Sequence, residues 1–153
     1  ALKETAASRE KEGEELKKDL LLKLEDINAE VKTIEEHAPE IIESYKQKIT
    51  EKVKEMLGTA SYDESRILTE VTIFADKVCV DEELVRLRSH IETTKNTLIA
   101  GGSIGRKLDF IAQEMNREAN TMLSKSTDMS LTDVAINLKT EIEKVREQIQ
   151  NIE

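Results

Sequence analysis

The stretch Gly101–Lys125, GGSIGRKLDFIAQEMNREANTMLSK, decides the fold of this chain. It opens with a glycine pair, which is typical of a tight turn between two helices. Apolar residues then recur every three or four positions, which marks one face of an α-helix. The remaining positions are unusually rich in charged and amide side chains. The stretch therefore predicts a turn followed by an amphipathic helix. The apolar face consists of Leu108, Ile111, Met115, Ala119 and Met122.

The segments on either side carry apolar stripes with the same helical period. One runs from Leu20 to Met56, a second from Ile67 to Leu98, and a third from Leu131 to Ile152. Pro39 interrupts the first, and because proline cannot donate a backbone hydrogen bond it should kink or divide that helix. The second stripe changes phase near Cys79, which predicts a stutter or a short break at 79–81.

These patterns predict an all-α fold of about four long helices. Short turns between them favour antiparallel neighbours, in a helical-hairpin or coiled-coil-like bundle. We expect residues 1–153 to form a single helical domain. Within it, residues 1–58 would make a long, Pro-kinked helical arm, and residues 61–153 would carry the remaining helices.

The composition supports this fold class and limits the functions it can serve. Charged residues make up 36% and aromatic residues 3%, which suits long helices and argues against a β-sandwich or barrel. The net charge is −9, yet residues 101–125 hold four basic and three acidic side chains, so they are the least anionic part. Cys79 is the single cysteine, which excludes an internal disulfide. We expect a buried structural thiol and a cytoplasmic protein without a transmembrane helix.

Two groups of polar residues could carry chemistry. Glu83, Arg86 and His90 lie at i, i+3 and i+7, so a carboxylate, a guanidinium and an imidazole share one helix face. A free imidazole has a pKa near 6.5, which suits proton transfer. A solvated ion pair beside a boundary histidine is the plainer interpretation.

The second group lies on the helix predicted within Gly101–Lys125. Glu114 and Glu118, at i and i+4, could hold a divalent cation, or Arg117 could neutralise both in an ion-pair ladder. Asn116 and Asn120 are mediocre helix formers one turn apart, which favours a polar network or contact with a ligand.

The beginning of the Gly101–Lys125 stretch also allows two interpretations. Glycines, exposed amides and two cations, Arg106 and Lys107, at a helix N-terminus would suit a phosphate. The stretch does not match the Walker pattern, and no strand precedes it. A tight interhelical turn is therefore the default interpretation.

Taken together, these motifs resemble the C-terminal half of the bacterial YicC/YloC family. The resemblance covers essentially the whole chain, and its most specific part is Gly105–Lys125. It implies an endoribonuclease that acts on single-stranded or structured RNA with a divalent metal such as Mn²⁺. It also implies a homo-oligomer, a ring-like hexamer, and a further N-terminal domain in full-length members. The matching residues include Asp81-Glu82-Glu83-Leu84, Ser89-His90, Gly105-Arg106-Lys107-Leu108-Asp109-Phe110, Gln113 to Thr121, and Ser124-Lys125.

The chain departs from the family pattern at Cys79, where the family carries an aspartate. If that aspartate contributes a carboxylate to the site, the departure weakens metal binding here. RNA is the expected partner, whereas a membrane and DNA are not.

The resemblance gives each polar group a hypothetical role. His90 would be the acid or base, Glu83, Glu114 and Glu118 would hold the metal, and Arg117 would meet the phosphate. Glu114 and Glu118 are the favoured metal pair. We expect both groups to converge on a shared polar cleft. In the alternative, the chain is a non-catalytic oligomerisation scaffold, which the charge of −9 favours. The expected RNA-binding or phosphate-binding residues are Arg86, Arg106, Lys107, Asn116, Asn120, Ser124 and Lys125.

Overall fold

The computed structural model describes residues 2–58, 61–127 and 129–152, and this part of the chain contains helices and short connecting segments but no strand. The predicted all-α class is therefore confirmed. The helices are α1 (Leu2–Leu57), α2 (Glu64–Val78), α3 (Asp81–Ala100), α4 (Gly105–Lys125) and α5 (Met129–Gln150).

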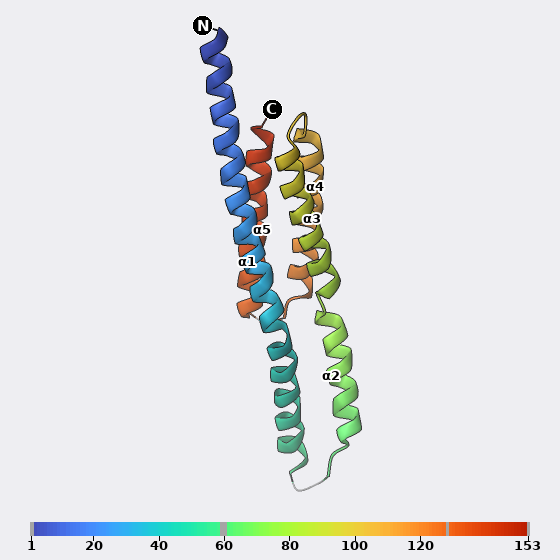
Figure 1. Ribbon diagram of the computed structural model, residues 1–153. Helices are drawn as coiled ribbons and strands as arrows, with labels where there is room; N and C mark the ends of the chain where they lie inside the picture. Colours follow the sequence, from blue (N-terminus) through green and yellow to red (C-terminus); the bar gives the residue numbers. More distant parts are fainter. Residues whose placement is uncertain (1, 59–60, 128, 153) are drawn as a thin grey trace.

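Four of the helices form an antiparallel bundle (Figure 1). The long helix α1 packs against α3 and α5, and α4 packs against the same two helices from the other side. Helix α2 lies in line with α3 and runs along the second half of α1 (Figure 1). Each helix therefore runs antiparallel to the neighbours it contacts, as the short connections predicted.

The core of the bundle consists of the predicted apolar stripes. Leu20, Leu24, Ile27 and Val31 of α1 are completely buried and meet the stripes of α3, α4 and α5. Each fully buried aliphatic side chain of this kind contributes about 1.5–3 kcal/mol. Helix α4 contributes Leu108, Ile111, Met115, Ala119 and Met122 to the same cluster, which confirms the face predicted for it.

Beyond the end of the four-helix bundle, the second half of α1 pairs with α2 alone (Figure 1). The rings of Tyr45 and Phe74 stack with their centroids 3.8 Å apart. Ile67 and Val71 of α2 are buried against α1, whereas Met56 near the end of α1 is 77% exposed. A pair of helices buries less apolar surface than a bundle, so the outer positions of this stripe stay exposed.

Pro39 lies inside α1, which passes through it without a break. The alternative of a divided helix is therefore wrong. Proline removes one backbone hydrogen bond, at a cost of about 3 kcal/mol. Packing of α1 against the bundle on one side of Pro39, and against α2 on the other, is extensive enough to offset that local cost.

The predicted break in the second stripe is confirmed, because Cys79 and Val80 separate α2 from α3. The expectation of a buried thiol is wrong, since Cys79 is exposed. At this break the backbone leaves the helix, and the apolar side chain of Val80 turns into the core while the thiol faces outward.

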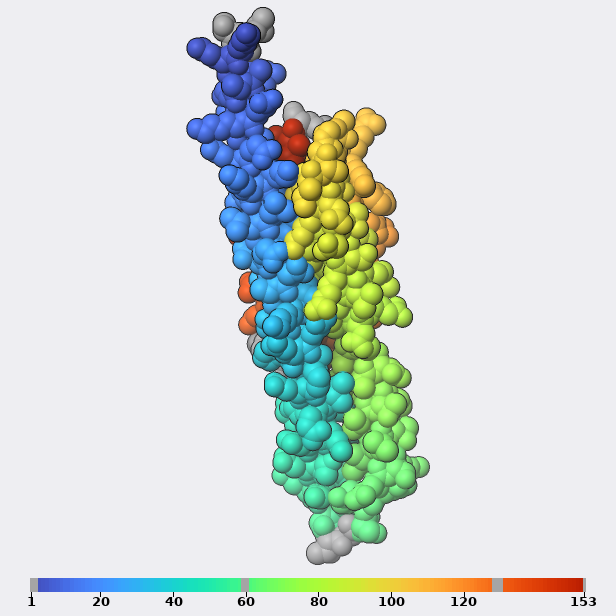
Figure 2. Space-filling model, in the orientation of Figure 1, coloured from blue at the N-terminus to red at the C-terminus, as the bar shows by residue number. Residues whose placement is uncertain are grey.

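The first turns of α1 extend beyond the rest of the molecule (Figure 2). Residues 3–15 are all exposed. At 1.5 Å per residue they form a projection of about 20 Å.

Glu30 of α1 provides a test of the contact between α1 and α5. Its Oε2 atom is buried, and burial, followed by the negative charges of Glu141 and Asp26, raises the pKa of this carboxyl. A raised pKa means that the ionised side chain opposes folding once the pH exceeds the pKa of the unfolded chain. We expect Glu30→Gln to stabilise the protein at pH 7 by about 0.5–1 kcal/mol, a gain that disappears at pH 4.

Urea unfolding at several pH values would measure this effect. Glu40→Gln, at an exposed position on the same helix, is the matched control. A gain for Glu30→Gln that did not change with pH would contradict the electrostatic explanation.

Candidate functional site

The turn between α3 and α4 reverses the chain, so that these two helices lie side by side. Gly101 and Gly102 adopt φ values of 70° and 88°, a region that residues with side chains rarely occupy. The amide of Gly101 donates to the carbonyl of Thr97 at 3.1 Å and closes the end of α3. The default interpretation of this segment as an interhelical turn is therefore confirmed.

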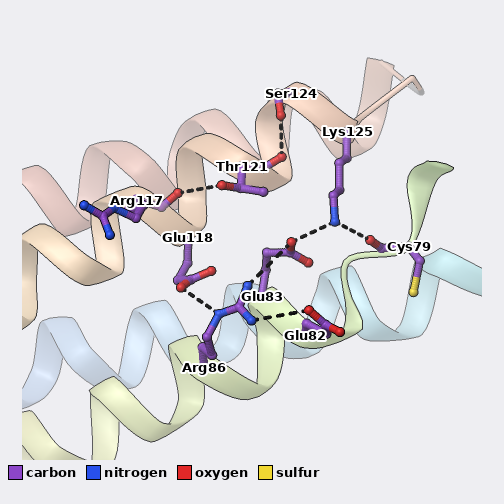
Figure 3. A network of polar contacts seen from close by, with 9 residues as sticks. All are labelled: Cys79, Glu82, Glu83, Arg86, Arg117, Glu118, Thr121, Ser124 and Lys125. Carbon is purple, nitrogen blue, oxygen red and sulfur yellow. Dashed lines mark hydrogen bonds and ion pairs between the residues drawn. The ribbon is translucent and has the colours of Figure 1, made fainter. Parts of the chain in front are cut away.

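Four side chains from α3 and α4 meet in a cluster of ion pairs (Figure 3). We call Glu83, Arg86, Glu118 and Lys125 the α3–α4 cluster. Arg86 Nε donates to Glu118 Oε1 at 2.8 Å, and Lys125 Nζ donates to Glu83 Oε1 at 2.7 Å. Arg86 Nη2 also lies 3.7 Å from Glu83 Oε1, so the two pairs are joined.

The carboxylates of the cluster are buried, whereas its cations reach the surface. Glu83 and Glu118 are 3% and 6% exposed. The side chains of Arg86 and Lys125 are 48% and 33% exposed. An anion arriving from solvent can therefore reach the two cations but not the carboxylates behind them.

The cations keep the buried Glu83 ionised. Burial by itself would raise the pKa of Glu83, but the hydrogen bond from Lys125 and the positive charges of Lys125 and Arg86 hold that pKa below its usual value. Carboxylates have the opposite effect on Arg86, whose pKa is raised chiefly by its hydrogen bond to Glu118. Both side chains are therefore charged at neutral pH.

His90 lies on α3 one turn after Arg86 and is half-buried. Four residues of helix correspond to about 6 Å along the axis, which places the backbone of His90 about one turn from that of Arg86. Among the described residues, none hydrogen-bonds to this ring. His90 is therefore a neighbour of the cluster rather than a member of it.

The two carboxylates that the sequence paired as metal ligands have different partners in the structure. Glu118 binds Arg86 across the bundle, whereas Glu114 pairs with Arg117 of its own helix at 3.6 Å. Arg117 is 74% exposed and, in Figure 3, lies on the side of α4 away from Arg86.

The amide and hydroxyl residues of α4 also diverge. Asn116 is partly buried, and none of the described residues donates to its buried Oδ1 atom. Asn120 and Ser124 are exposed. These three side chains are therefore not part of the α3–α4 cluster.

Arg106 and Lys107 lie at the far end of α4 from Lys125. Both are exposed beside the Gly101–Gly102 turn. Nineteen residues of helix separate Arg106 from Lys125, which corresponds to about 28 Å. The phosphate-binding residues expected from the sequence therefore lie in two separate places and do not converge on one cleft.

The donor atoms of the cluster do not suit a divalent metal. Lys125 and Arg86 already occupy the near oxygens of Glu83 and Glu118, and each fills the place that a metal ion would take. In the described part of the chain, no three His, Cys, Asp or Glu side chains come close enough to share an ion. A divalent metal stays a prediction that rests on the family resemblance.

Two contacts of the cluster were not foreseen from the sequence. Glu82 Oε2 accepts a hydrogen bond from Arg86 Nη1 at 3.4 Å. Their i, i+4 spacing could have indicated this pair. Lys125 Nζ also donates to the backbone carbonyl of Cys79 at 3.1 Å, a contact that no side-chain pattern encodes.

Lys125 also lines a cavity of about 550 Å³ where the bundle meets the α1–α2 pair. The other walls are mostly apolar, with contributions from Pro39, Cys79 and Leu131. Such walls do not suit a nucleic acid backbone, so the exposed side of Arg86 is the better place for a phosphate.

Removing the charge of Lys125 should destabilise the fold. Lys125→Met would leave the buried Glu83 carboxylate with Arg86 at 3.7 Å as its nearest cation. Breaking a buried ion pair costs about 3–5 kcal/mol, and we expect about 3 kcal/mol here because Arg86 still offers partial compensation. Urea unfolding at pH 7 would measure this loss.

The double variant Glu83→Gln/Lys125→Met is the control, because it removes the uncompensated charge. It should regain most of the lost stability. In the wild type, the contribution of Glu83 is present above its unfolded pKa and is lost as the pH falls through the folded pKa. The cost of Lys125→Met should therefore shrink toward acidic pH, and a constant cost would contradict the ion-pair explanation.

The fold and the cluster define a class of protein. The chain is a helical-bundle domain in which two adjacent helices hold buried carboxylates against half-exposed cations. No helix in the described residues is long and apolar enough to cross a membrane.

Within that class, the chain belongs to the family described as "Endoribonuclease YicC-like, C-terminal", whose model matches residues 34–153. The resemblance drawn from the sequence motifs is thereby confirmed.

Two curated relatives agree with this assignment, and both are named "Probable endoribonuclease YicC". The protein of Clostridioides difficile (strain 630) is 44% identical over 146 residues, which cover 95% of this chain and 50% of that protein. The protein of Haemophilus influenzae (strain ATCC 51907 / DSM 11121 / KW20 / Rd) is 37% identical over 147 residues, covering 96% and 50%. The chain thus spans about half the length of these relatives.

Proposed function

We propose that this chain is the C-terminal part of an endoribonuclease and that the α3–α4 cluster binds the phosphate at the cleavage site. The observation that carries the proposal is the partly exposed pair of cations, Arg86 and Lys125, held by buried carboxylates in a chain of this family. The names of the two curated relatives support the same activity.

The geometry gives each residue of the cluster a task. Arg86 and Lys125 would stabilise the negative charge that grows on the phosphate oxygens, which is the largest contribution in many enzymes. Glu83 and Glu118 are positioning residues, because they hold those cations in place before RNA arrives. An arriving phosphate would compete with Glu118 for Arg86.

His90 would move the proton, since it lies one turn from Arg86 and can act as acid or base. The 2′-hydroxyl would lose its proton to the base, and the 2′-oxygen would attack the phosphorus. The bond from phosphorus to the 5′-oxygen would then break as that oxygen gains the proton that His90 took up. The products are a 2′,3′-cyclic phosphate and a 5′-hydroxyl end.

Cleavage of an end-labelled RNA tests the proposal directly. The chain would be incubated with the RNA in Mn²⁺ and, separately, in EDTA, and the new ends would be identified. A 2′,3′-cyclic phosphate end supports the mechanism, and a 3′-hydroxyl end would overturn it. Loss of activity in EDTA alone would support the predicted metal.

A scaffold without catalytic activity is the alternative, and one observation favours it. Every cation of the α3–α4 cluster is neutralised by a carboxylate, in a chain whose net charge is −9. In that case the chain would assemble into a homo-oligomer such as a hexamer, and RNA capture would need residues outside it. A chain that neither binds nor cuts RNA, while it still self-associates by analytical ultracentrifugation, would establish the scaffold.

A further inference from the structure

The outer face of α4 carries a row of exposed side chains that the α3–α4 cluster does not use. They follow one another at spacings of four and three residues, which places them on a single stripe of the helix. This stripe spans about 27 Å at 1.5 Å per residue. We call it the outer stripe, and it consists of Arg106, Phe110, Gln113, Arg117, Asn120 and Ser124.

Phe110 is the unusual member of the outer stripe. Its side chain is 63% exposed, although the chain contains only two phenylalanines. The other one, Phe74, stacks on Tyr45. An aromatic ring that faces water forgoes the stabilisation that burial of its apolar surface would give, so a contact with another molecule would recover it.

The charges around Phe110 suit an anionic partner. Arg106 lies one turn before it and Arg117 two turns after it, and the outer stripe contains no carboxylate. The nearest acidic side chains are already paired. Asp109 accepts hydrogen bonds from Arg146 at 3.3 Å and from Gln113 at 3.1 Å, and Glu114 pairs with Arg117.

The composition of the stripe disfavours another helix as its partner. A seam between helices needs apolar side chains at most of its positions, and Phe110 is the single apolar residue of the outer stripe. A single nucleic acid strand needs the reverse combination. Cations follow its backbone, and an aromatic ring stacks on a base whatever the sequence.

We propose that the outer stripe of α4 binds single-stranded RNA, with a base stacked on Phe110 and flanking phosphates near Arg106 and Arg117. This inference rests on the proposed function for the class of nucleic acid, and it adds that the bound strand is unpaired beside Phe110. A base in a duplex is covered on both faces, so paired RNA cannot offer one to the ring.

Fluorescence provides a direct test, because the chain has no tryptophan. Phe110→Trp places a single reporter on the outer stripe and keeps an aromatic ring there. Titration with an unstructured oligouridine should quench its emission, because a base stacks on the indole. The duplex of oligouridine with its complement should quench it several-fold less at the same concentration.

Leu68→Trp is the matched control, since Leu68 is 59% exposed but lies on α2. Its emission should not respond to either RNA. Binding by a labelled strand should fall about tenfold or more in Phe110→Leu, which keeps an apolar side chain but removes the ring. Circular dichroism would establish that each variant keeps its helix content.

The results separate this inference from the proposed function. Quenching by oligouridine without any cleavage would support RNA binding at the outer stripe and overturn the nuclease activity. Cleavage without quenching would support the nuclease activity and overturn RNA binding at the outer stripe. Equal quenching by the duplex would overturn the single-strand preference. A change in emission with protein concentration, in the absence of RNA, would show instead that a second copy of the chain covers Phe110.

Discussion

His90→Ala should lower the rate of RNA cleavage by about 10²- to 10⁴-fold, which is the usual contribution of a general acid or base. His90 is half-buried one turn after Arg86 on α3, and no described side chain holds its ring. Its replacement therefore breaks no hydrogen bond of the fold. We expect the helix content and the state of assembly to stay as in the wild type.

The second histidine of the chain provides a matched control. His37 lies on α1, where its Nδ1 atom hydrogen-bonds to the carbonyl of Thr33 at 2.8 Å. His37→Ala should cut RNA at the wild-type rate. Single-turnover cleavage, with enzyme in excess over labelled RNA, measures the chemical step in both variants. Unchanged turnover in His90→Ala would remove histidine from the mechanism.

Arg86→Gln should reduce cleavage by about 10²- to 10³-fold, a loss comparable to that of one donor from an oxyanion hole. Arg86 is the one side chain that contacts both carboxylates of the α3–α4 cluster, and half of it faces solvent. A phosphate that binds the cluster would meet this guanidinium first. Glutamine keeps hydrogen-bonding capacity but removes the charge.

Arg86→Gln also leaves Glu118 buried without its cation, so lost activity could reflect lost structure. The double variant Arg86→Gln/Glu118→Gln separates the two effects, because it contains no uncompensated carboxylate at this position. It should fold as the wild type by circular dichroism and still fail to cut RNA. Recovery of cleavage in the double variant would mean that Arg86 is needed only to neutralise Glu118.

Arg88→Gln is the matched control for the charge. Arg88 lies two residues further along α3, but it pairs with Glu35 of α1 at 2.5 Å. Both substitutions therefore remove one arginine and one interhelical ion pair. Equal loss of cleavage in Arg88→Gln would assign the effect to net charge or to stability rather than to the α3–α4 cluster.

The helices were predictable because burial imposes a period on the sequence. Apolar residues every three or four positions marked Leu20 to Ile34 and Leu108 to Met122, and these residues form the core. The glycine pair and the change of phase near Cys79 placed two of the helix ends. The division at Pro39 was a local expectation that tertiary packing overrode.

The candidate site was only partly predictable. The sequence brought Glu83 and Arg86 onto one face of α3, and it marked Glu118 and Lys125 as polar residues of α4. It could not decide which of Glu114 and Glu118 faces α3, because positions four residues apart differ by only about 40° around a helix. It also grouped Arg106 with Lys125, although the length of α4 separates them.

The amino-acid sequence by itself therefore determined the fold class, most helix boundaries and the family of this protein. These follow from local geometry, from the period of apolar residues and from a motif that is continuous along the chain. Only the tertiary structure decided that Arg86 and Lys125 bind buried carboxylates and that Phe110 faces outward. The reason is that a side chain's partner depends on how each helix is rotated and shifted against its neighbours, and packing of the whole core sets both.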